Sequence, residues 1–142
     1  MIKPHGGCLA ACLALGLALA GFPATPANAA TAYLANSGTG SACTQAMPCA
    51  SMVSAVAAAG AGGEVICLDK SSYSSVSITA SVTISCGDGL WEAPGAAFTI
   101  STPAGADVVI EGLVTDSLSL TGTTMSFSGQ GSLHLRRVRI GN

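Results

Sequence analysis

A repeat in the second half of the chain most strongly restricts the folds that this sequence can adopt. Short segments in which apolar residues alternate with polar or small ones begin at Val82, Val108 and Leu133, at nearly equal spacing along the chain. A similar segment precedes each of them, at residues 76–78, 98–100 and 125–127. Alternation with a period of two predicts β-strands, and repetition at this spacing predicts a stacked parallel coil.

The repeat also predicts which residues lie side by side. Equivalent residues in neighbouring parallel strands lie about 4.8 Å apart. The step from the second repeat to the third places Ile110 beside Leu135, and therefore Glu111 beside Arg136 on the outward side. Opposite charges on neighbouring strands favour this register over a one-residue slip, which would turn the apolar residues outward.

Residues 1–29 are typical of a secretory signal peptide. Lys3 and His5 precede an apolar run over residues 8–21, and Ala27-Asn-Ala29 provides a cleavage site before Ala30. Cys12 lies near the start of the apolar run, which leaves lipid attachment there as an alternative. The run is shorter than the roughly 20 residues of a membrane span. We therefore expect a secreted or periplasmic protein without a stable membrane span.

Four cysteines follow the signal segment, an even number that favours disulfides in an exported protein. Their spacing favours the pairs Cys43–Cys49 and Cys67–Cys86. Two stacked, buried thiols are the alternative for the second pair. No CxxC motif is present and His134 is the only histidine after the signal segment, so we expect no metal ion and no cofactor.

Residues 30–63 form the predicted N-terminal cap, and residues 64–142 form the predicted rungs. Within the cap, Ser51 can begin a short helix that ends at Gly60. The apolar face of this helix consists of Met52, Ala55, Val56 and Ala59. Residues 64–68 form a nearly continuous apolar run, which predicts a first strand buried on both faces.

Several segments resemble bacterial exported proteins of the pectate-lyase-like superfamily. The resemblance rests on residues 33–38, 43–52 and 62–73, and on the later residues 82–89, 108–113 and 132–138. It implies an all-β fold, a right-handed parallel β-helix of about three to four short rungs with an N-terminal capping helix. Where the family often has Asn or Cys at a bend, this chain has Arg137 and Val138. The resemblance implies a fold more than an activity.

Few residues offer chemistry. The acidic residues are scattered and none recurs as a pair at the rung spacing, so we assign no catalytic residue. Trp91, in a predicted loop over residues 90–97, is a candidate for stacking on a sugar ring or for shielding the coil. The other binding candidates are the arginines of the only basic cluster, which otherwise form a solvated face: Arg136, Arg137 and Arg139.

The formal net charge of −2 gives no basic field for nucleic acid. The sequence favours an exported, non-catalytic module that serves binding or surface structure, with carbohydrate or a cell-surface component as the candidate partner. A carbohydrate-active enzyme or its inactive relative is one alternative, and a truncated fragment of a longer protein is another. Val138 and Ile140 belong to the last rung, whose unpaired edge predicts self-association.

Overall fold

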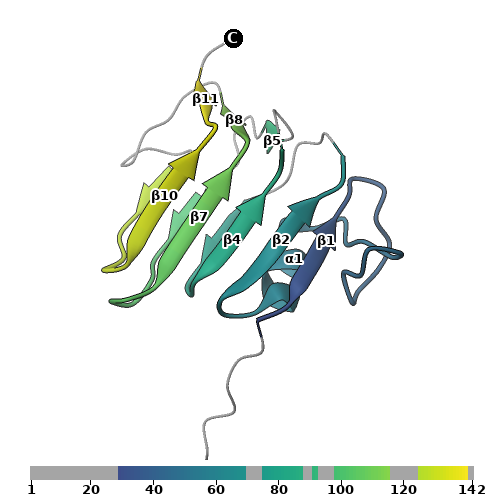
Figure 1. The fold of residues 1–142 in the computed structure, drawn as a ribbon, viewed down its shortest axis with the longest axis horizontal. Helices are drawn as coiled ribbons and strands as arrows, with labels where there is room; N and C mark the ends of the chain where they lie inside the picture. The colour runs from purple at the N-terminus through teal and green to yellow at the C-terminus, as the bar shows by residue number, and fades with distance from the viewer. Residues whose placement is uncertain (1–28, 70–74, 88–90, 93–97, 116–124, 141–142) are drawn as a thin grey trace, which may run out of the picture.

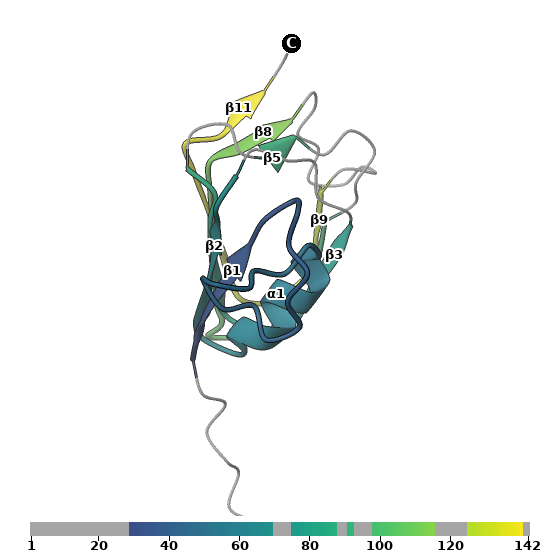
Figure 2. The same cartoon turned by 90° about the vertical axis from the view of Figure 1, so that its right-hand side faces the viewer.

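The computed structural model describes residues 29–69, 75–87, 91–92, 98–115 and 125–140, which form three parallel sheets and one helix (Figures 1 and 2). Sheet A contains five strands in the order β1 (Thr31–Leu34), β2 (Gly63–Cys67), β4 (Val82–Ser85), β7 (Asp107–Glu111) and β10 (Ser132–Arg136). Sheet B has the order β11 (Arg139–Ile140), β8 (Leu113–Thr115) and β5 (Trp91–Glu92). Sheet C has the order β3 (Val76–Ile78), β6 (Phe98–Ile100) and β9 (Met125–Phe127).

The register of sheet A places one inward-facing residue of each strand beside the next. Cα pairing joins Ala32, Val65, Ile84, Ile110 and Leu135 in a single row across the sheet. The predicted pairing of Ile110 with Leu135 is confirmed, together with the pairing of the residues that follow them. Alternation in β2, β4 and β7 buries every second residue, as expected for strands with one face on a core.

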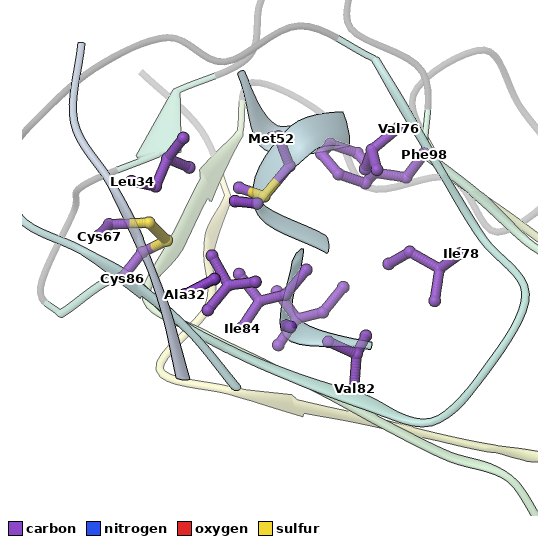
Figure 3. Close-up of a cluster of buried hydrophobic side chains, with 14 of the residues drawn as sticks. Ala32, Leu34, Met52, Cys67, Val76, Ile78, Val82, Ile84, Cys86 and Phe98 are labelled. Atoms are coloured by element: carbon purple, nitrogen blue, oxygen red, sulfur yellow. A yellow bond between two sulfur atoms is a disulfide. The ribbon is translucent and has the colours of Figure 1, made fainter. Parts of the chain in front are cut away.

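The apolar core lies between the inner faces of the sheets (Figure 3). Val82 and Ile84 of β4 point into it from sheet A, while Ile78 and Phe98 enter it from sheet C. All four side chains are buried. Because burying a large apolar side chain stabilises a fold by about 1.5–3 kcal/mol, this core is the main source of stability among the described residues.

The helix α1 (Met52–Ala59) packs against β1, β2 and β3 and lies at the end of the core next to β1 (Figure 2). The prediction of this helix and of its stop at Gly60 is confirmed. Met52, Ala55 and Ala59 are buried, whereas Val56 is partly buried. Ser51 occupies the N-cap position, but its hydroxyl makes no capping hydrogen bond.

The predicted fold class, a right-handed parallel β-helix of three to four rungs with a capping helix, is corrected by the structure. The described strands form separate parallel sheets of unequal size, with five, three and three strands. β1 has no counterpart in either small sheet, and two strands of sheet B contain only two residues each. The repeat identifies which strands pair, but equal spacing along the chain does not by itself make uniform turns of a coil.

Two predictions about the first strands were also wrong. Residues 64–68 do not form the first strand, because β1 precedes them and pairs with β2 from Thr31 to Leu34. β2 itself is not buried on both faces, because Ile66 is only partly buried and Leu68, just beyond the strand, is 44% exposed. An edge position for β1 and a single core on one side of sheet A explain this alternation.

Both predicted disulfides are present. Cys43 is bonded to Cys49, and Cys67 to Cys86. The second bond joins residues directly after paired positions of β2 and β4, since Ile66 lies beside Ser85. The bonded cysteines are separated by 6 and 19 positions in the sequence. In the chain-entropy description, closing these loops, which contain one residue more than each separation, contributes about 2.4 and 3.3 kcal/mol to stability.

A residue with a left-handed backbone conformation follows each of the last three strands of sheet A, β4, β7 and β10. Gly87, Gly112 and Arg137 have φ angles of 60°, 80° and 51°, and they are equally spaced along the chain. At Gly112, a Cβ atom would overlap the carbonyl oxygen of Gly87. Glycine is required at this position both for its φ angle and for the close approach of the two backbones.

Replacing Gly112 therefore tests the tight stacking of these corners. Gly112→Ala should destabilise the protein by about 1–3 kcal/mol more than Gly105→Ala, because overpacking adds to the strain of a left-handed alanine. Gly105 is a matched control, since it also has a φ of 80° but no atom within 4 Å of the added Cβ. Urea denaturation of the disulfide-intact variants measures the difference. Equal losses for both variants would contradict the close approach.

Candidate functional site

Each sheet has a terminal strand from the last part of the chain. This strand is β10 in sheet A, β11 in sheet B and β9 in sheet C. Figure 1 shows β10 and β11 on the side of the molecule farthest from β1. Four apolar residues near these strands are only partly buried against the core: Phe127, Leu133, Leu135 and Val138. We call β9, β10 and β11 with these four side chains the open end.

The opposite edge of sheet A is covered by the chain itself. The amide of Tyr33 in β1 donates a hydrogen bond of 2.7 Å to the carbonyl of Cys43, and the Tyr33 carbonyl accepts one of 2.9 Å from the amide of Cys49. The amide of Ala35 donates to the carbonyl of Cys49 at 2.9 Å. The disulfide closes this loop into a short covering segment. The outer edge of β1 is therefore partnered.

The backbone groups on the outer edge of β10 can be assigned from its bonds to the neighbouring strand. The Ser132 amide donates to the Ala106 carbonyl at 2.8 Å, and the Arg136 carbonyl accepts from the Gly112 amide at 3.0 Å. Because the backbone groups of a strand alternate between its two edges, His134 also faces β7. The amides and carbonyls of Leu133 and Leu135 consequently point to the outer edge of the sheet.

The side chains of the same two leucines turn toward the core. Their partners in β7, Val108 and Ile110, are 0% exposed, whereas Leu133 and Leu135 are only partly buried. The difference arises because β7 has a strand on each side and β10 has one on one side only. An edge strand with apolar side chains and unpaired backbone groups is a template for pairing with another strand.

Two arginines meet on one carboxylate beside this edge. Arg136 Nη1 lies 3.2 Å from Glu111 Oε1, and Arg137 Nη2 lies 3.0 Å from Oε2. The hydrogen bond from Arg136 lowers the pKa of the Glu111 carboxyl below its usual value, partial burial opposes this shift, and the bond from Arg137 adds to it. The predicted contact between Glu111 and Arg136 is confirmed. The contact between Glu111 and Arg137 was not predicted from the sequence.

The contact with Arg137 depends on an unusual backbone. A left-handed conformation disfavours a residue with a Cβ by about 1–2 kcal/mol, and glycine stands at the two equivalent corners. The strained corner directs the guanidinium of Arg137 to the outward carboxylate. The sequence signal for this arrangement was the equal step from Gly87 to Gly112 and from Gly112 to Arg137.

The predicted binding candidates do not form one site. Trp91 lies in β5 rather than in a loop, and the rest of the predicted excursion lies outside the described residues. β8 separates β5 from β11, which contains Arg139. Arg136 and Arg137 are 63% and 53% exposed and share a carboxylate, so the structure brings these two together. Sugar binding by Trp91 or by the arginines stays a prediction.

A hollow of about 280 Å³ lies elsewhere, between α1 and the segment from β3 to β4. Val53, Val56 and Val82 line it with the hydroxyl side chains of Ser77 and Thr79, and no lining residue carries a charge. Within the described ranges, no three His, Cys, Asp or Glu side chains are grouped to hold a metal ion. The part of the chain that is described also contains no helix long and apolar enough to cross a membrane.

Comparison with known proteins gives no relative: no protein-family model, curated protein or solved structure matches the chain. The resemblance of the sequence to the pectate-lyase-like superfamily thus stays a prediction. Function must be argued from the arrangement at the open end.

The ion pair at this end makes a pH-dependent contribution to stability. The pKa of Glu111 is lowered in the folded protein, so its contribution is present above the usual pKa of 4.5 and is lost as the pH falls through the lowered value. In a double-mutant cycle of Glu111→Gln and Arg136→Gln, we expect a favourable coupling in urea denaturation at pH 7 that disappears at a pH low enough to protonate Glu111. Coupling of equal size at both pH values would contradict this origin.

Proposed function

We propose that this chain is an exported, non-catalytic protein that binds a polypeptide through the open end. The supporting observation is the difference between the two edges of sheet A. A disulfide-closed loop covers the edge at β1 and Ala35 with three backbone hydrogen bonds, whereas no described residue bonds the outer-edge backbone groups of Leu133 and Leu135 in β10.

The chemistry of the open end favours an extended peptide over a small molecule. A strand added beside β10 would take main-chain hydrogen bonds from Leu133 and Leu135, and its alternate side chains would cover the partly buried apolar residues. Main-chain bonds give affinity to such contacts, and the spacing of the apolar side chains gives specificity. Arg136 and Arg137 add a charged border on the outward face.

Export is part of this proposal. It rests on the signal-like sequence of residues 1–29, which lie almost entirely outside the described residues, and on the two disulfides. Disulfides of this kind persist in oxidising compartments such as the periplasm or the cell exterior.

The mass of the exported protein tests this part. We expect a chain that begins at Ala30 and carries no free thiol, because both cysteine pairs are oxidised. Intact-mass measurement before and after reduction and alkylation reads both features at once. A mass that includes Met1, a lipid on Cys12, or free thiols in the native protein would contradict export by signal cleavage.

Peptide binding to the open end is tested by hydrogen exchange. The probes are short synthetic peptides that alternate apolar and polar residues, among them one with the sequence of residues 131–137. We expect at least one peptide to slow amide exchange at Leu133 and Leu135 in dilute protein, because an added strand would bond these amides. Ile84, in the interior of sheet A, provides the internal control and should not change.

A scrambled peptide that groups its apolar residues is the matched control probe. It has the same composition but cannot place side chains alternately, so its effect on Leu133 and Leu135 should be absent. If no alternating peptide slows exchange at these amides, or if the scrambled peptide acts equally well, the proposed function is wrong.

A further inference from the structure

We propose that the polypeptide recognised by the open end is a second copy of this chain, bound by antiparallel pairing of the two β10 strands about a two-fold axis at His134. This inference rests on the proposed function and names its partner. It is carried by the sequence of β10, by the direction of its free backbone groups and by the covered edge at β1.

The covered edge determines the symmetry. A head-to-tail assembly would place β10 of one copy against β1 of the next, but the loop from Cys43 to Cys49 already bonds the outer edge of β1. Of the two outer edges of sheet A in the described residues, the edge of β10 is the one without a strand or loop beside it. Two copies that use the same surface are related by a two-fold axis, and a two-fold axis across an edge strand makes the new pair antiparallel.

The inward and outward faces then restrict the register. Leu133 and Leu135 face the core, whereas Ser132, His134 and Arg136 are exposed. Inward residues must stand opposite inward residues if the apolar faces of the two copies are to be continuous. Pairing centred on His134 satisfies this condition, because Leu133 then stands opposite Leu135 of the second copy and the whole of β10 takes part.

The free backbone groups fit the same register. The outer-edge amides and carbonyls belong to Leu133 and Leu135, and in this pairing they face each other in the two copies. Each of the two leucine pairs exchanges two hydrogen bonds, as the narrow pairs of an antiparallel ladder do. His134 stands opposite His134 of the second copy. These two residues form a pair without hydrogen bonds, with Cα atoms about 4.5 Å apart.

Charge disfavours one of the displaced registers. Centring the pair on Arg136 would put two guanidinium groups directly opposite each other. In the register centred on His134, Arg136 faces the uncharged Ser132 while it remains bonded to Glu111 of its own chain. Like charges directly opposite each other destabilise a strand pair, so the register centred on Arg136 is disfavoured. Registers centred on Leu133 or Leu135 leave part of β10 unpaired, whereas the register centred on His134 pairs all of it.

Cysteine cross-linking tests the register. In His134→Cys the two introduced thiols would lie within the Cα separation of a disulfide, so mild oxidation of the exported variant should give a covalent dimer. Ser132→Cys is the matched control on the same exposed face. Its two thiols would be offset along the paired strands by about 13 Å, which is too far for a disulfide. A dimer from Ser132→Cys alone, from both variants equally, or from neither would overturn the proposed pairing.

The unmodified protein gives a second measurement that does not depend on an added cysteine. Sedimentation of the exported chain over a concentration series up to millimolar should show a monomer–dimer equilibrium. His134→Glu should weaken it by about fivefold, since two carboxylates would then stand directly opposite. Ser77→Glu adds the same charge at an exposed position of β3, away from the open end, and should leave the equilibrium unchanged. A monomer throughout the series would overturn the second copy as partner.

The two proposals fail in different ways. If alternating peptides protect Leu133 and Leu135 but the protein stays monomeric, the open end binds polypeptide and the partner is not this chain. If the protein stays monomeric and no peptide slows amide exchange at Leu133 and Leu135, both the dimer and the proposed function are wrong. Larger oligomers that His134→Glu does not affect would contradict the two-fold arrangement.

Discussion

The row of inward-facing residues across sheet A is the constraint on which the rest of the structure depends. Ala32, Val65, Ile84, Ile110 and Leu135 lie beside one another in five successive strands. A slip of any strand by one residue would move its apolar side chains from the core to solvent, so each strand has one favourable register. Chain segments far apart in sequence thereby acquire fixed partners, and the side chains on both faces of the sheet follow.

Features on the two faces of sheet A agree with this single register. On the core side, the register of β2 and β4 brings Cys67 beside Cys86, where the disulfide joins them. On the outer side, the register of β7 and β10 brings Glu111 beside Arg136. The ion pair is exposed to solvent on the arginine side and adds little to stability. The left-handed backbone of Arg137 brings a second guanidinium to the same carboxylate.

The sequence predicted those features that a period reveals. Strands β4, β7 and β10 were found because their alternating residues recur at the repeat spacing, and the helix because its apolar residues share one face. β5 and β11 were beyond this method, since two residues show no alternation. β1 was missed because it stands outside the repeat, next to the signal segment. The predicted fold class was wrong for a related reason. The period of the repeat specifies which strands pair, but it does not specify how the sheets are arranged.

The open end was partly predictable, and its strength as a binding surface follows from its size. The position of β10 beside β7 was expected from the repeat, but the covered edge at β1 depends on bonds from a loop without periodicity. Fully burying a leucine contributes about 1.5–3 kcal/mol, so the partly buried Leu133 and Leu135 each retain at most about a third of that. Four such side chains in a two-fold pair would yield at most about 2–4 kcal/mol, no more than the lower estimates of about 4 kcal/mol for the entropy lost on association. A contact limited to β10 must therefore be weak, and it becomes populated only where the chain is concentrated or where β9 and β11 also find partners.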